Sequence, residues 1–389
     1  MHEPDPPLPP DDLAASALPP DPVQAAAPQP ATAPPASPLR HLPALAGIGA
    51  IVLAAISALA WTAGWVGGGL TASRMTDAIE ATGAAHPGFR RAHAKGVCVY
   101  GTYRANGAAV ALSSARVFAQ AETPVLGRLS IAGGDPHGLD AKARVRSMAL
   151  LLRTDDGQEW RTAMNSFPFF PVATPAGFHA QTLASQPDPA TGKPDPAKLA
   201  AFAAQYPEVK KFQAWAASAP WSNSWGNTEY NGVNAFRFTA ADGSARYVRW
   251  SMRPQLPFAP LDASERDRAD ADFLAHDLAA RLAAGPLRWD MVLTVAAPGD
   301  AVNDASQAWP DDREHVVAGT LELVRAEPQA TGQCRDVNYD PLILPDGIAG
   351  SDDPILAARS AVYAQSFNRR EREIAHDKAP EAIGQGGAQ

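Results

Sequence analysis

The chain has 389 residues, which is enough for a large domain with a complete hydrophobic core. Its formal net charge is −8 and it contains no run of basic residues, which argues against a protein that binds nucleic acid through phosphate contacts. Its two cysteines, Cys98 and Cys334, are too few for a disulfide-rich scaffold or a four-cysteine metal site. They can form one disulfide bridge or none.

The N-terminal segment, residues 1–43, is rich in proline and alanine, acidic and almost free of aromatic side chains. Such a segment buries too little apolar surface to offset the entropy that it would lose on ordering. We therefore expect residues 1–43 to form a disordered tail.

An uncharged apolar run extends from Leu42 to Ser73. A helix needs about 20 such residues to cross the hydrocarbon core of a membrane, and Trp61 and Trp65 near its end suit the membrane interface. This pattern predicts a transmembrane anchor over residues 44–70. A cleaved signal peptide is the alternative, although its apolar core is usually shorter and closer to the N-terminus. One arginine flanks each end of the run, so charge does not determine the orientation.

A short linker, residues 71–87, leads to a globular segment over residues 88–373, and a second disordered tail is expected over 374–389. Within the globular segment, apolar and polar residues alternate with the period of two that is typical of antiparallel strands. The strand-like stretches are 96–103, 124–133, 143–152, 234–252 with the turn "ADGSA", 288–297 and 317–326. Helical patterns occupy 195–218, 263–285 and 351–375. The sequence thus predicts an α+β fold, with a barrel-like antiparallel sheet and appended helices.

The last predicted helix carries one candidate for chemistry. We expect Ser351 to be its N-cap, because acidic residues and Pro354 follow directly. Arg359 and Tyr363 are four residues apart, so their side chains are adjacent on one face. A guanidinium beside a tyrosine oxygen favours the phenolate form, which is a hard anionic ligand suited to Fe(III). Taken alone, the same pattern also describes an ordinary amphipathic helix.

His93 is the second candidate, within the stretch "RRAHAKGVCVYG" at residues 90–101. Taken alone, a histidine between basic residues is a solvated surface group. The chain contains no GxSxG, Walker, HExxH or CxxC motif, so the common nucleophile, nucleotide and zinc sites have no anchor in it.

Together these two stretches resemble the haem catalases. "RRAHAKG" is similar to the R-x-x-H-A-K-G segment that carries the distal histidine of that family, and "RSAVY" is similar to its proximal R-x-x-x-Y segment. Between them, "GRLSIAGG", "RSMALLLRTDDGQEWRTAMNSFPFF" and "NYDPLILPDGIAGSDDPIL" resemble further catalase segments in the same order. The resemblance covers roughly residues 88–372 and is greatest to the compact catalase-related peroxidases.

The resemblance implies haem b as the cofactor, with Tyr363 as the iron ligand and Arg359 holding it as phenolate. His93 would act as general acid–base on the other haem face, taking a proton from the near oxygen of peroxide and returning it to the far one. Ser130 occupies the place of the serine that hydrogen-bonds this histidine. The arginines at positions that bind haem propionates are Arg90, Arg128 and Arg370.

One departure from the family concerns a distal asparagine. An ungapped alignment from Trp160 to Pro168 places Ser166 at that position and Asn165 one residue earlier. Neighbouring side chains of a strand point to opposite faces, so Asn165 can substitute for it only if the backbone shifts, and both Ser166 and Asn165 stay candidates for the catalytic site. Because that asparagine helps to orient a second peroxide, we expect peroxidase activity with little catalase activity.

The expected function is therefore a haem peroxidase that reduces hydrogen peroxide or organic hydroperoxides with an unidentified electron donor. With the predicted anchor, we expect it in the inner membrane with the haem domain in the periplasm; an oligomer stays open. The alternatives are a haem enzyme that rearranges fatty-acid hydroperoxides and an anchored haem-binding sensor without turnover. Closure of a barrel brings its first and last strands together, which is compatible with a Cys98–Cys334 bridge and equally with two buried thiols.

Overall fold

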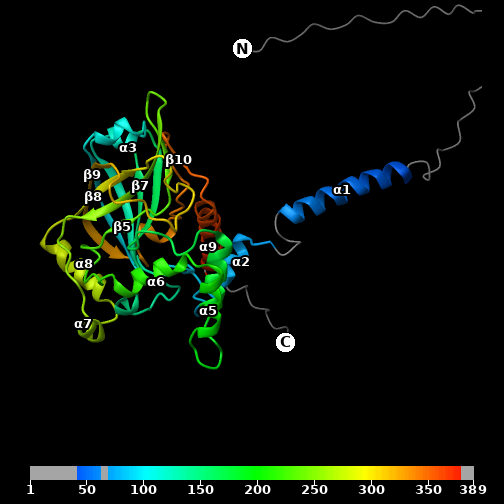
Figure 1. The fold of residues 1–389 in the computed structure, drawn as a ribbon, viewed down its shortest axis with the longest axis horizontal. Coiled ribbons are helices and arrows are strands. Elements are labelled where there is room, and N and C mark those ends of the chain that lie inside the picture. Colours follow the sequence, from blue (N-terminus) through cyan, green and yellow to red (C-terminus); the bar gives the residue numbers. More distant parts are fainter. Residues whose placement is uncertain (1–41, 63–68, 378–389) are drawn as a thin grey trace, which may run out of the picture. The chain divides into compact units, whose positions relative to one another are not determined.

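The computed structural model describes residues 42–62 and 69–377 (Figure 1). Almost all of the expected tail over residues 1–43, and residues 378–389 of the expected C-terminal tail, lie outside these ranges. The chain divides into two units, Met1–Ala63 and Gly64–Gln389, which are treated separately below.

The first unit contains helix α1, Leu42–Thr62. Its residues Leu42–Trp61 have a mean hydropathy of 2.2 and none of them is buried. Within the described ranges, α1 is the one helix whose length and composition suffice to cross a membrane. Residues 63–68 of the expected anchor, Trp65 among them, lie outside the described part.

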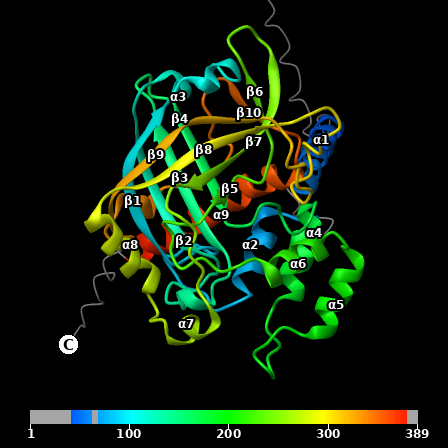
Figure 2. The ribbon, with the colours of Figure 1, turned by 60° about the vertical axis from the view of Figure 1, so that its left-hand side comes forward.

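The second unit is built on an antiparallel sheet (Figure 2). Eight of its strands follow one another as β7-β5-β4-β3-β2-β1-β9-β8, and a direct β7–β8 pairing closes them into a barrel. β6 and β10 extend the sheet beside one end of β7. The strands are β1 Gly96–Ala105, β2 Thr123–Ile131, β3 Arg146–Arg153, β4 Glu159–Asn165, β5 Tyr230–Asn231, β6 Phe236–Thr239, β7 Ala245–Pro254, β8 Leu287–Val295, β9 His315–Pro328 and β10 Ile348–Gly350. The predicted antiparallel barrel is confirmed.

Alternation along each strand separates the barrel interior from its outer face. On β4, Trp160, Thr162 and Met164 are buried in the interior, while Ala163 and Asn165 lie on the outer face. Large side chains fill the interior, where the ring centroids of Trp160 and Trp250 are 5.0 Å apart. The interior is therefore a packed core.

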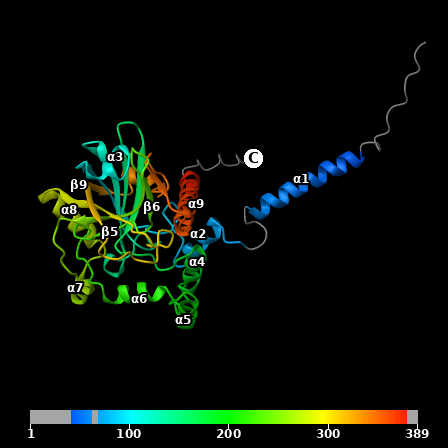
Figure 3. The same ribbon diagram turned by 45° about the horizontal axis from the view of Figure 1, so that its top comes forward.

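The helices of this unit cover parts of that outer face. They are α2 Ala72–Glu80, α3 Arg116–Ala119, α4 Pro175–Ala184, α5 Pro196–Gln205, α6 Val209–Ser218, α7 Ala263–Arg268, α8 Phe273–Ala284 and α9 Pro354–Asp377, with the short turns η2 Ala108–Ala111, η3 Asp140–Lys142 and η4 Gln333–Asp336. Figures 1 and 3 show α9, α2, α4 and α5 on the same side of the barrel, and α2 packs against both α9 and α4.

Helix α2 corrects the expected linker over residues 71–87. Thr71 caps it, with its Oγ1 accepting a hydrogen bond from the backbone N–H of Arg74, and Met75 is buried. Arg369 of α9 forms ion pairs with Asp77 and Glu80. This segment belongs to the folded unit because one face of a short amphipathic helix is covered by α9, a contact that local composition does not reveal.

The start of α9 also differs from expectation. The carboxylate of Asp353 accepts the backbone N–H of Ile355 at 2.9 Å, and its carbonyl accepts the N–H of Leu356. Asp353 is therefore the N-cap in place of Ser351, whose hydroxyl only accepts a 3.4 Å bond from the N–H of Asp353.

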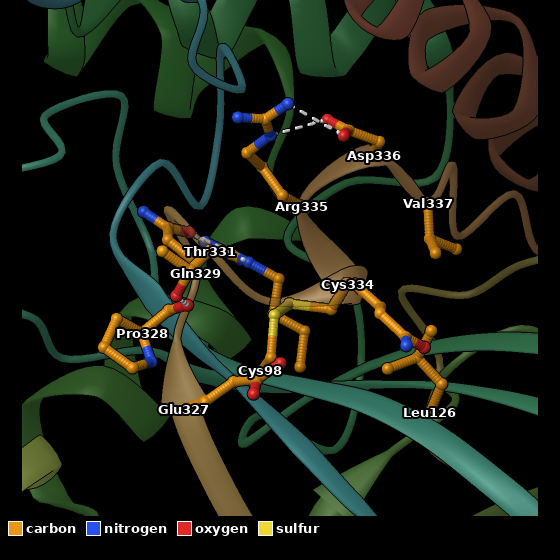
Figure 4. Close-up of a disulfide and its surroundings, with 12 residues drawn as sticks. Cys98, Leu126, Glu327, Pro328, Gln329, Thr331, Cys334, Arg335, Asp336 and Val337 are labelled. Carbon is orange, nitrogen blue, oxygen red and sulfur yellow. Dashed lines mark hydrogen bonds and ion pairs between the residues drawn. A yellow bond between two sulfur atoms is a disulfide. The ribbon is translucent and has the colours of Figure 1, made fainter.

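A disulfide joins Cys98 on β1 to Cys334 on η4, with 5.4 Å between the two Cα atoms (Figure 4). Both sulfur-bearing residues are fully buried. A side chain at Gly332 would collide with Sγ of Cys98, so the close approach of η4 to β1 requires glycine there. Of the two states left open by the sequence, the bridge is the one found.

Candidate active site

A cavity of about 300 Å³ lies between the outer face of β2–β4 and helix α9, with α2 and α4 contributing to its wall. It brings together most of the residues proposed from the sequence, namely His93, Ser130, Asn165, Tyr363, Arg90, Arg128, Arg359 and Arg370. It does not include Ser166. The flat part of its wall consists of small side chains such as Ala149 and Ala163.

His93 is held in an unusual backbone conformation, with φ of 55°. For a residue with a side chain this left-handed region costs about 1 kcal/mol or more, which the surrounding structure has to offset. Burial, together with the positive charge of Arg128 and Arg359, lowers the pKa of His93 from 6.5 to about 4. The imidazole is therefore neutral near pH 7 and able to accept a proton.

A hydrogen-bond chain determines which nitrogen of His93 accepts that proton. The Oγ of Ser147 lies 3.1 Å from Nδ1 of His93 and donates its hydrogen to Oδ1 of Asn165 at 2.6 Å. Because a hydroxyl has one hydrogen, Ser147 can only accept from the imidazole, which assigns the proton to Nδ1. Nε2 is then left with a free lone pair.

Ser147 corrects the expectation for Ser130. Ser130 lines the same cavity and is directly opposite Ser147 in the β2–β3 ladder, but the hydroxyl that bonds His93 belongs to Ser147. Sequence analysis missed Ser147 because the run around it is an ordinary strand pattern. The useful signal was the register of β2 against β3, which places two serines side by side and is not visible in either segment alone.

Of the two candidates at the end of β4, Asn165 lines the active-site cavity and Ser166 does not, so the expectation that Ser166 holds the distal position is corrected. Asn165 is paired with Ser147 in the β3–β4 ladder and faces the cavity. Ser166 instead accepts a hydrogen bond from the backbone N–H of Arg146 and lines a different cavity. Alternation along the strand was applied correctly, but the ungapped alignment was displaced by one residue. The structural argument for little catalase activity is thereby removed.

Tyr363 projects into the cavity from α9 beside Arg359. Nη2 of Arg359 is 3.4 Å from the phenolic oxygen and donates to the carbonyl of Ala163 at 2.7 Å. Its Nη1 donates to Oδ1 of Asn234 at 2.5 Å, and Asn234 in turn donates to Asp353 at 2.8 Å. Arg359 is thus held by neutral oxygens, so its charge acts on the tyrosine oxygen.

Three buried guanidiniums gather at one end of the cavity. Arg90 donates to the carbonyls of Cys334 and Val337, and Arg128 donates to Gln329 and to the carbonyl of Ala94. Burial and mutual repulsion lower the pKa of both Arg90 and Arg128, the latter to about 10.

The third guanidinium, on Arg370, is 2% exposed, and its Nε has no hydrogen-bond partner. In the described part of the chain, no ion pair joins Arg90 or Arg128 to a carboxylate, and Arg370 has one at 3.5 Å with Glu371. Three buried guanidiniums with a single carboxylate paired to them form a site for anions.

Gly96 makes the position of Arg128 possible. A Cβ at Gly96 would lie 2.7 Å from Nη2 of Arg128 and would also collide with the carbonyl of Leu129. This explains in physical terms why glycine closes the "RRAHAKG" stretch. Lys95 of the same stretch forms ion pairs with Asp140 and Asp272 and so fixes the loop to the barrel.

The residues of this cavity fit a flat, iron-containing macrocycle with two carboxylates. Small outer-face side chains permit a planar group to approach, the phenolic oxygen is an iron ligand, and the buried guanidiniums match the carboxylates. The buried Nε of Arg370 has no acceptor among the residues that the structure describes, and a bound carboxylate would supply one.

The fold is that of the catalases. The structure is similar to catalase A from Saccharomyces cerevisiae, with a TM-score of 0.66 and 18% identity over 73% of this chain and 62% of that one. It is also similar to a bacterial catalase, with a TM-score of 0.65 and 21% identity over 73% of this chain and 58% of that one.

The chain belongs to the catalase family, whose model matches residues 85–377. It is 40% identical to a catalase-related peroxidase of Synechococcus elongatus, over 80% of this chain and 92% of that protein. It is 36% identical to a catalase-related peroxidase of Mycolicibacterium paratuberculosis, over 78% of this chain and 96% of that protein.

Proposed function

We propose that the protein is a haem-dependent peroxidase that reduces hydrogen peroxide or organic hydroperoxides with an external electron donor. One observation carries the proposal. A neutral histidine and an arginine-paired tyrosine line one cavity together with buried, uncompensated guanidiniums. The similarity to catalase-related peroxidases supports the same reaction class.

In this proposal the cavity holds haem b. Tyr363 would ligate the iron through its phenolic oxygen, which lies 3.4 Å from Nη2 of Arg359. The propionates would pair with Arg90, Arg128 and Arg370. The bound haem supplies the iron and the electrons for cleavage of the peroxide O–O bond.

The protein's own contribution to that cleavage is the movement of one proton. Nε2 of His93 takes the proton from the near oxygen of the peroxide and returns it to the far oxygen, which leaves as water or an alcohol. Ser147 keeps Nδ1 protonated, so that Nε2 is the basic atom. The amide of Asn165 is fixed by Ser147 and faces the same space, where it orients the peroxide.

Because Asn165 faces the cavity, we propose that the protein also has catalase activity. Donor oxidation is the proposed main reaction, and measurable oxygen release from hydrogen peroxide alone accompanies it.

The proposal is tested with purified full-length protein. Ferric haem with a tyrosinate ligand is expected in the absorption spectrum, and Tyr363→Phe should change that spectrum while Tyr247→Phe, on the barrel strand β7, should not. An unchanged spectrum in Tyr363→Phe would refute the ligand assignment. Turnover of a fatty-acid hydroperoxide without any donor would identify a rearranging enzyme instead. If His93→Ala binds haem and behaves towards peroxide like the unmodified protein, the result would identify a non-catalytic haem-binding module.

We further propose that α1 anchors the protein in the inner membrane and that the haem domain lies on the periplasmic side. The apolar composition of Leu42–Trp61 supports the anchor. The Cys98–Cys334 bridge supports the compartment, because disulfides persist in oxidising surroundings. Protease added to intact spheroplasts should degrade the haem domain; protection of that domain until the membrane is lysed would contradict the proposed orientation.

A further inference from the structure

A second cavity, of about 400 Å³, lies next to the active site. Arg146 and Ser166 contribute to its wall, while their direct neighbours in the chain, Ser147 and Asn165, line the active-site cavity. Consecutive residues at the start of β3 and at the end of β4 thus line two different cavities, with Ser166 directly following β4. We call this second space the donor cavity.

The donor cavity is positively charged at a buried point. Arg146 is 2% exposed; its Nη1 donates to the hydroxyl of Ser222, 3.1 Å away, and to the carbonyl of the same residue. Its Nη2 is buried and has no hydrogen-bond partner within residues 42–62 and 69–377, and burial lowers the pKa of Arg146 to about 10. Among the described residues, no ion pair neutralises either Arg146 or its neighbour Arg144. A buried guanidinium with one nitrogen left without a hydrogen-bond partner calls for an anionic ligand.

The same cavity has aromatic walls. The guanidinium of Arg144 lies between the indoles of Trp215 and Trp221, 4.9 and 5.0 Å from their centroids. All three nitrogens of Arg144 donate to carbonyls of the segment that carries these indoles, those of Ala216, Ala219 and Pro220. The two rings are therefore held in place by Arg144, a cation whose charge is not compensated, and Arg266 lies over the Trp221 ring as well, at 4.5 Å.

An aromatic contact connects the two cavities. Trp215, which lines the donor cavity, makes an edge-to-face contact with Phe167 at 6.2 Å between centroids. Phe167 lines the active-site cavity. An oxidisable indole thus lies between a ligand in the donor cavity and the proposed haem site.

We propose that the donor cavity binds the electron donor of the peroxidase and that this donor is a phenol carrying a carboxylate. The carboxylate pairs with Arg146, and the ring packs against apolar lining residues of the cavity, namely Trp215, Leu256, Pro257 and Phe258. This inference rests on the proposed peroxidase function. One hydroperoxide and two phenols yield one alcohol, one water and two phenoxyl radicals, each phenol losing one electron and one proton.

Binding can be measured without turnover. Calorimetric titration of the haem-loaded, full-length protein with 4-hydroxybenzoate should show affinity about tenfold or more above that for the neutral isostere 4-hydroxybenzamide, as expected for one charge-assisted hydrogen bond in a buried site. Arg146→Gln should abolish this preference. Arg237→Gln, on the exposed side of β6, removes the same charge elsewhere and should retain it.

The comparison of the two ligands on the unmodified protein needs no variant, so it stands if Arg146→Gln does not fold. In the peroxidase assay, Arg146→Gln should raise KM for 4-hydroxybenzoate more than KM for 4-hydroxybenzamide. If the protein cleaves peroxide but binds both ligands equally, the donor inference is overturned and the peroxidase function stands. If it selects the carboxylate but does not react with peroxide, the peroxidase function is overturned, and the donor role with it.

Discussion

Ser147 Oγ lies 3.1 Å from Nδ1 of His93, and the two residues come from segments 54 positions apart. The hydroxyl of Ser147 donates its hydrogen bond to Asn165, so it can only accept a hydrogen bond from the imidazole. A single hydroxyl on β3 therefore determines the protonation state of one ring nitrogen and the basicity of the other.

Replacement of this serine tests the hydrogen-bond chain. In Ser147→Ala, Nδ1 loses its acceptor, and the tautomer with a free Nε2 is no longer favoured. We expect kcat/KM for hydrogen peroxide to fall by about tenfold or more, which corresponds to one lost hydrogen bond of about 1.5 kcal/mol, while haem content stays the same. Ser130→Ala, one strand away, should have a clearly smaller effect. Equal losses in both variants would contradict the assignment.

The pH dependence of peroxide reduction follows from the pKa of His93. Burial lowers this pKa from 6.5 to about 4, so the neutral, proton-accepting form predominates above that value. We expect activity to persist as the pH falls through 6.5 and to be lost only towards pH 4. A pH–rate profile of kcat/KM measures this limb, and a midpoint at or above 6.5 would contradict the prediction.

The same shift links His93 to stability. Between pH 6.5 and about 4 the unfolded chain binds a proton at this histidine and the folded chain does not, so acidification in this window favours unfolding. His93→Gln should make the unfolding free energy less dependent on pH in that window. Urea titrations of both proteins at pH 4.5 and 7 provide the measurement, and parallel changes in the two proteins would exclude His93 as the cause.

Oxygen release tests the role of Asn165. Its amide faces the active-site cavity, whereas the adjacent Ser166 faces the donor cavity. In Asn165→Ala, we expect oxygen release from hydrogen peroxide to fall by more than tenfold, because the peroxide loses a positioned hydrogen-bond partner. Ser166→Ala serves as the matched control, with a smaller effect on oxygen release. Oxygen release is measured with an oxygen electrode. If Ser166→Ala lowered it more than Asn165→Ala, Ser166 and not Asn165 would be the residue that orients the peroxide.

The disulfide is expected to support both stability and the haem site. Cys98 and Cys334 are separated by 236 residues in the chain, so the bridge closes a large loop and lowers the conformational entropy of the unfolded state (Figure 4). We expect Cys98→Ser with Cys334→Ser to lower the unfolding free energy by about 2–5 kcal/mol, measured in urea.

The bridge also holds the turn whose carbonyls, those of Cys334 and Val337, receive Arg90. The double variant should therefore release haem faster to an acceptor protein than the disulfide-bonded form. Unchanged release, with lowered stability, would separate the two roles.

Local periodicity was sufficient for much of the fold and for part of the site. Alternating strands predicted the barrel, and the spacing of Arg359 and Tyr363 predicted adjacent side chains on α9, since a helical turn places residues four apart together. The R-x-x-H-A-K-G stretch identified His93 and Arg90, and the same resemblance identified Arg128 and Arg370. These features depend on neighbours in sequence or on motifs contained in one segment.

Tertiary structure alone decided which serine bonds His93, whether Asn165 or Ser166 faces the active site, whether the two cysteines pair, and that residues 72–80 pack on α9. Each of these depends on the register between strands or on the docking of a helix, which arise from pairing of segments far apart in the chain. A shift of one residue exchanges the two faces of a strand without altering its local pattern. The donor cavity has the same origin, since β3, α6, β7 and the residue that follows β4 contribute to its wall, and only the closed barrel brings them together.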